Sequence, residues 1–154
     1  MPLPIMQRAR LLIVLLAFVV AAAGATAPAL ARHLDAFRSA DPVARAKAMT
    51  AAARMGAAAV SALAAALKDE NAEVRFWSAF ALGEMKPPRA ARPAVPALIR
   101  VLEESDEGVV RNAAYSLGLI GPAAKSAAPA LRRLLKSPNQ QYVRNAAYAL
   151  ARLS

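Results

Sequence analysis

The sequence predicts an all-α protein folded as a right-handed α-α superhelix, an alpha solenoid of about 3.5 two-helix repeats. Three observations support this class. Glycine is scarce, with 6 residues in 154, and the alanine-rich segments favour helix. Three apolar segments beginning at Val60, Val95 and Ala128 align without gaps, at spacings of 35 and 33 residues. A second set of segments, marked by Leu82-Gly83 and Leu117-Gly118, alternates with them.

The N-terminus is expected to be a secretory signal rather than part of this fold. Arg8 and Arg10 precede an uncharged apolar run over residues 11–23, and small residues follow up to Ala31, which is the layout of a signal peptide. The run is short of the roughly 20 residues that span a bilayer as a helix. We expect cleavage after Ala31, with an uncleaved signal anchor as the alternative. Weaker cleavage sites follow Ala25 and Ala27.

Cysteine content and charge narrow the classes of function. The chain has no cysteine, which excludes disulfides, thiolate-bound zinc and a thiol nucleophile. From Arg32 onward 18 basic and 10 acidic residues remain, a formal charge of +8. The signal would send the chain to the periplasm of a bacterium or outside the cell. There a basic surface favours acidic proteins, anionic lipids or acidic glycans as partners ahead of nucleic acid.

Each repeat is expected to contain two helices and two turns. Helical spacing of apolar residues predicts the first helix of successive repeats at about 73–81, 109–116 and 142–149, and Leu150 starts a fourth copy of the Leu-Gly segment. The second helices begin near the three aligned segments. The expected organisation is therefore a signal over 1–31, a cap over 32–40 and a repeat domain over 41–154, with repeats at about 41–70, 71–105, 106–138 and a half repeat at 139–154.

Capping residues, prolines and glycines agree with this division. Asp41 and Ser137 each stand directly before a proline and are expected to cap the helices that follow. Pro96 and Pro129 fall in the first turn of the second helices, where proline loses no intrahelical hydrogen bond. Four glycines are expected to close helix ends in the left-handed conformation, at positions 56, 83, 118 and 121.

The repeats resemble HEAT repeats, in the short variety shared with phycobilin lyases. The resemblance rests on the Val-Arg…Ala-Leu-Gly pattern of the first helix and the Val-Pro-Ala-Leu pattern of the second, and it covers about 41–154. The Trp, Gly-Tyr and late-Pro pattern of tetratricopeptide arrays is not met. In the third and fourth copies Val110 and Val143 stand in the arginine position. The continuous arginine ladder that the resemblance implies is therefore not expected here.

The sequence contains no constellation that indicates an enzyme. The single histidine, His33, is expected to be a solvated residue near the mature N-terminus. Acidic residues cluster in the turns, as at Asp69 and Glu103, where they complement the positive ends of the helices that follow. The glycines match no phosphate-binding fingerprint. We therefore expect no catalytic residue, no cofactor, no metal site and no small-molecule substrate.

Two groups of residues are candidates for binding a partner. The resemblance implies that the second helices line the concave face, which would place there Arg100, Arg132, Arg133 and Lys136. After Glu107 the chain has no acidic residue, so this groove is expected to become more basic toward the C-terminus. A solvated, solubilising face is the alternative explanation.

Phe76 and Trp77 form the second group. Because they are adjacent on one helix, they cannot both point into the same core stripe. At least one is expected to be exposed or covered by another segment, and an exposed tryptophan is a common binding anchor.

Together these features predict an exported, non-enzymatic protein-protein interaction module or small scaffold. The alternative is a polyanion binder that uses the basic groove for anionic lipid, acidic glycan or nucleic acid. A third, less favoured function is that of an accessory to an enzyme, which the resemblance to phycobilin lyases implies.

Overall fold

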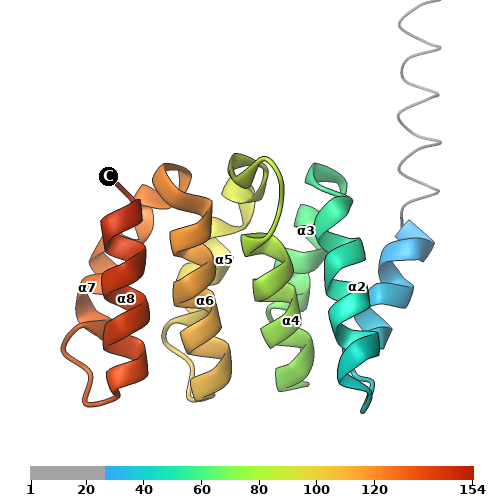
Figure 1. Cartoon of the computed structure of the whole chain (residues 1–154), viewed down its shortest axis with the longest axis horizontal. Coiled ribbons are helices and arrows are strands. Elements are labelled where there is room, and N and C mark those ends of the chain that lie inside the picture. Colours follow the sequence, from blue (N-terminus) through green and yellow to red (C-terminus); the bar gives the residue numbers. More distant parts are fainter. Residues whose placement is uncertain (1–26) are drawn as a thin grey trace, which may run out of the picture.

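The structure is a computed structural model that describes residues 27–154. Within this range all regular structure is helical, which confirms the predicted class. Helices stack side by side in two layers along one axis (Figure 1). Most of the predicted signal peptide lies in residues 1–26, outside the described residues.

The first helix of each repeat, here called an A helix, lies in one layer, and the second, the B helix, lies in the other (Figure 1). Short 3-10 helices precede two of the B helices. The A helices are α2 Pro42–Arg54, α4 Ala72–Gly83, α6 Glu107–Ile120 and α8 Gln140–Arg152; the B helices are α3 Ala57–Ala66, α5 Val95–Val101 and α7 Ala128–Leu134; the 3-10 helices are η1 Pro88–Ala94 and η2 Gly121–Ala127.

Leucines from both layers form the core between them. Leu82 and Leu117 of the A helices are fully buried, as are Leu63, Leu98 and Leu131 of the B helices. Each repeat buries its apolar face only against its neighbours, as in other solenoids. The aligned segments of the sequence therefore correspond to one repeated core position in each layer.

An N-terminal helix over 27–36 packs against the first repeat. Leu30 is 5% exposed and Phe37, just after the helix, is fully buried. The helix begins upstream of the cap expected over 32–40, and the expected cleavage point after Ala31 falls within it. Cleavage there would remove Leu30 from the core; the cleavage site stays a prediction.

The helix caps were predicted correctly at one of two positions. Asp41 caps α2, because its side chain accepts a hydrogen bond from the Val43 N–H. The expected cap at Ser137 is wrong. Its hydroxyl accepts from the Asn139 N–H at 3.1 Å within the turn, and Asn139 itself caps α8. Pro96 and Pro129 lie in the first turns of α5 and α7, as expected.

The glycines have two different roles. Gly56 and Gly121 adopt positive φ angles of 56° and 70° at helix boundaries. Their ψ angles of −136° and −139° lie outside the left-handed helical region, so only the sign of φ agrees with the prediction. The left-handed conformation expected at Gly83 and Gly118 is wrong, because neither has a positive φ angle. Each of them instead lies where the next A helix passes close by. A Cβ on Gly83 would lie 2.9 Å from the Ser116 Cα. These two glycines therefore permit close approach of the A helices.

Candidate interaction surface

Asparagine side chains connect the last three A helices. Asn112 of α6 donates to the Phe76 carbonyl of α4 at 2.7 Å, and Asn145 of α8 donates to the Arg111 carbonyl of α6 at 3.0 Å. Sequence analysis missed this ladder. The signal was present in the pentapeptide Arg-Asn-Ala-Ala-Tyr, which occurs at 111–115 and again at 144–148.

Tyrosines and Arg152 complete the contact between α6 and α8. The Tyr115 and Tyr148 rings, which hold equivalent positions in successive repeats, stack with centroids 5.2 Å apart. The Arg152 guanidinium lies over the Tyr148 ring at 5.5 Å, and its Nε donates to the Gly118 carbonyl at 2.9 Å. This end of the array is held by specific polar contacts as well as by apolar packing.

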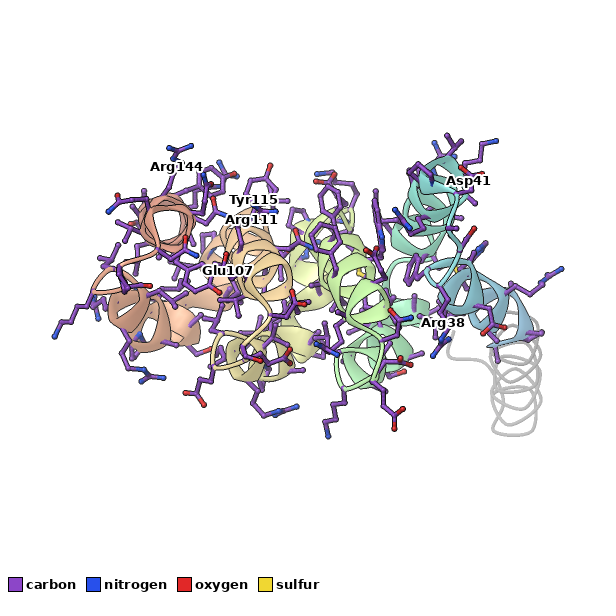
Figure 2. The ribbon with its side chains drawn as sticks, turned by 90° about the horizontal axis from the view of Figure 1, so that it is seen from below. Arg38, Asp41, Glu107, Arg111, Tyr115 and Arg144 are labelled. Carbon is purple, nitrogen blue, oxygen red and sulfur yellow. The ribbon has the colours of Figure 1, made fainter. Side chains whose placement is uncertain are left out.

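The arginine pattern changes after the second repeat. Arg45 and Arg75 each donate to a backbone carbonyl six residues earlier, at 2.8 Å in both cases. Val110 occupies the equivalent position in α6 and is buried. The neighbouring Arg111 and Arg144 are exposed and lie on their A helices, away from the B layer (Figure 2). Neither forms an ion pair within residues 27–154.

Trp77 lies between the first two A helices, at the position that asparagine holds in later repeats. Its Nε1 donates to the Glu73 carboxylate at 2.9 Å, and the Arg45 guanidinium lies 5.9 Å from the centre of its ring. Phe76 meets it edge-to-face at 5.3 Å. Both aromatic side chains are half-buried. Trp77 is therefore largely engaged inside the chain, and its role in partner binding stays a prediction.

The seam between α2 and α4 is looser than the later seams. α2 packs less extensively on α4 than α4 does on α6. A Trp stands where the ladder has Asn, and Ala53 stands where the later helices have Gly83 and Gly118. An open cleft of about 330 Å³ lies at one end of this seam, lined by residues that include Arg54, Glu84 and Lys86.

The B helices present the predicted basic residues to solvent. Arg100 of α5 and Arg132 of α7 are exposed, as is Lys136 just after α7. None of the three forms an ion pair within the described residues. Arg133 is also exposed, but it pairs with Glu103 at 2.9 Å. This pair links α7 to the end of α5 and leaves three unpaired cations on the face.

The described residues contain no cluster of metal-binding or reactive side chains elsewhere. Over residues 27–154 no group of three or more His, Asp or Glu side chains has an arrangement that could hold a metal ion. The one perturbed titratable group in that range is Tyr142, whose pKa is raised by burial and by the nearby Glu107 and Asp106 carboxylates. Nor does this range contain a helix long and apolar enough to cross a bilayer.

Comparison with solved structures supports the two-layer helical architecture. A chain from the structure of the CpcE–CpcF complex of phycocyanin lyase from Nostoc sp. PCC7120 is 26% identical to this chain, with a TM-score of 0.70. The match covers 82% of this chain and 78% of that chain. An engineered protein matches at 24% identity and TM-score 0.58, over 79% of this chain and 60% of its own length. A designed armadillo repeat protein solved in complex with a (KR)4 peptide matches at 20% identity and TM-score 0.61, over 81% of this chain and 64% of that one.

The chain thus spans less than two thirds of the length of those two designed proteins. No curated protein sequence matches it. The family model for HEAT repeats matches twice, over residues 28–93 and 91–151, and these two matches include all of the A and B helices except the last residue of α8. The chain belongs to the HEAT-repeat family.

Proposed function

We propose that this protein is an exported, non-enzymatic interaction module that binds an acidic protein along its B-helix face. The observation that carries the proposal is a set of three exposed cations without ion pairs in the described residues: Arg100 on α5, Arg132 on α7 and Lys136 just after α7. Solenoids present extended faces of this kind to their partners. Electrostatic complementarity would give such a face its choice of an acidic partner and a fast association rate.

The test is affinity capture from the envelope fraction of the native organism at low and at high salt. The baits are the wild-type chain and a face variant, Arg100→Gln/Arg132→Gln/Lys136→Gln. A matched control, the edge variant Arg89→Gln/Arg92→Gln/Lys125→Gln, removes the same charge elsewhere. We expect one acidic protein to be retained by the wild type and the edge variant and lost from the face variant. Equal capture by all three baits would contradict the proposal.

A polyanion binder is the second candidate, favoured by the absence of any acidic residue after Glu107. Binding that depends on phosphate or sulfate groups falls steeply with salt because counterions are released. Recovery of only nucleic acid, glycan or lipid, abolished at high salt, would support this candidate against the first.

The similarity to phycocyanin lyase supports a third candidate, an accessory to an enzyme that attaches a chromophore. Mixing the chain with a free bilin tests it, because binding would change the pigment's absorbance spectrum.

Export is tested separately by cell fractionation with intact-mass measurement. A shortened chain in the envelope or periplasm is expected, whereas an unprocessed chain in the cytosol would contradict export. Finding the unprocessed chain in the cytosol would not test partner binding by the B-helix face, which the capture experiment tests separately.

A further inference from the structure

Acidic residues are concentrated at one of the two long edges of the solenoid. The edge at which the A helices begin carries Asp41 and Glu107, as Figure 2 shows from below, together with every other acidic residue except Glu84. The opposite edge, uppermost in Figure 1, is formed by the ends of the A helices and the turns that lead to the B helices. We call it the cationic edge, and its basic residues are Arg54, Lys86, Arg89, Arg92, Lys125 and Arg152.

The basic residues of the cationic edge have no acidic partners. All six are exposed, and none forms an ion pair within residues 27–154. The ion pairs of the described chain use acidic residues of the other edge, as Arg38 does with Asp69 and Arg75 with Glu104. Only Glu84 offsets the charge of the cationic edge, so this edge has a concentrated positive field.

Helix stability does not account for three of these cations. Arg54 and Arg152 lie in the last turns of α2 and α8, where a positive charge is favourable. Arg89 lies near the start of η1, and Arg92 and Lys125 lie in the last turns of η1 and η2, which lead directly into α5 and α7. There the partial positive charge of the following helix opposes them.

The same three cations line one open cleft between η1 and η2. The cleft has a volume of about 590 Å³ and no acidic residue in its lining, which also includes Val95 and Pro122. An external anion would relieve the repulsion among these side chains.

The described part of the chain begins toward this same edge. The helix over 27–36 runs beside α2 in the opposite direction (Figure 1), so its first turn lies toward the cationic edge. The apolar run over 11–23 is joined to it through only a few residues. If this run stays in a bilayer as an uncleaved anchor, its short connection to the helix would hold the cationic edge near that bilayer.

We propose that the cationic edge docks the solenoid onto a bilayer rich in anionic lipid headgroups. A row of separated cations along a flat edge can contact many headgroups at once. Each Lys or Arg close to such a surface raises partitioning about fivefold, so the three cleft cations together contribute about 100-fold. The proposal does not depend on protein binding by the B-helix face, which lies on a different side of the molecule.

Vesicle co-sedimentation tests this proposal with the whole chain, so that residues 11–23 contribute equally in every variant. The vesicles are phosphatidylcholine alone, or phosphatidylcholine and phosphatidylglycerol in equal parts. The edge variant Arg89→Gln/Arg92→Gln/Lys125→Gln is compared with the face variant Arg100→Gln/Arg132→Gln/Lys136→Gln. All six side chains are exposed, so both variants are expected to fold, and circular dichroism melting checks this.

We expect the edge variant to lose about 100-fold in partitioning to the anionic vesicles and the face variant to lose only a few-fold. Neither variant should differ from wild type on phosphatidylcholine alone. Equal losses of partitioning in the two variants would mean that binding depends only on net charge, and this would overturn the proposal. Equal binding of the wild type to both vesicle types would also overturn it. Tighter binding of polyglutamate or DNA than of vesicles through the same three residues would also overturn it, in favour of an acidic protein or a nucleic acid.

Discussion

Replacing Gly118 with alanine should separate α8 from α6. A Cβ at this position would lie 2.8 Å from Cε1 of Tyr148 and 2.9 Å from the Cα of Ala149. The tyrosine ring can turn aside, but the Ala149 backbone can retreat only if the whole of α8 moves. Such a movement would strain the hydrogen bonds from Asn145 and Arg152 to carbonyls of α6.

The size of the effect follows from three terms. Overpacking costs about 1–3 kcal/mol, and loss of the two hydrogen bonds costs about 1 kcal/mol each. Alanine recovers about 1 kcal/mol over glycine inside a helix. We expect Gly118→Ala to lower the free energy of unfolding by about 2–4 kcal/mol. Urea denaturation measures this value, and amide hydrogen exchange should show the lost protection concentrated in α8.

Gly108 provides a matched control within the same helix. A Cβ there would meet the Asp106 carboxylate at 3.3 Å and a Phe76 ring carbon at 3.9 Å, so little must move. Gly108→Ala should leave stability unchanged or raise it by up to about 1 kcal/mol. If Gly118→Ala proved as stable as Gly108→Ala, with unchanged protection of α8, the close-approach role of Gly118 would be refuted.

Three further predictions concern the ladder, the N-terminal helix and alkaline pH. Asn112→Ala should cost about 1 kcal/mol by removing the donor to the Phe76 carbonyl; urea denaturation showing no greater loss than Arg111→Ala would contradict this. Leu30→Ala should cost about 2–4 kcal/mol because the side chain is buried, and thermal melting should show little effect of the exposed Val43→Ala. Burial and the Glu107 carboxylate raise the pKa of Tyr142 above 10.0, so its neutral form is favoured in the folded state. The resulting stability is complete below pH 10.0 and is lost as pH rises through the folded pKa. Tyr142→Phe should therefore lose less stability than wild type in urea melts at alkaline pH, and an identical decline would count against the assignment.

The repeat architecture could be predicted from the sequence because its signals are local and periodic. The core leucines recur at the repeat spacing, and proline in the first turn and glycine at positive φ depend only on the backbone of their own segment. The error at Ser137 was also local, since either Ser137 or Asn139 can cap a helix and the choice depends on where the turn closes. In contrast, the sequence could not show which cations of the B-helix face are unpaired. That depends on the position of Glu103, which pairs with Arg133 in the folded chain.

The fold class, the number of repeats and the exposure of the basic B-helix residues follow from local patterns in the sequence. The distance between neighbouring A helices, in contrast, is known only from the tertiary structure, because it depends on which side chains meet between the two helices. Asn112 with Gly83 permits close approach of α4 and α6, whereas Trp77 with Ala53 keeps α2 apart from α4. The cationic edge likewise emerges only on folding. Arg92 and Lys125 are 33 residues apart in the sequence and line one cleft because successive repeats stack in the same orientation.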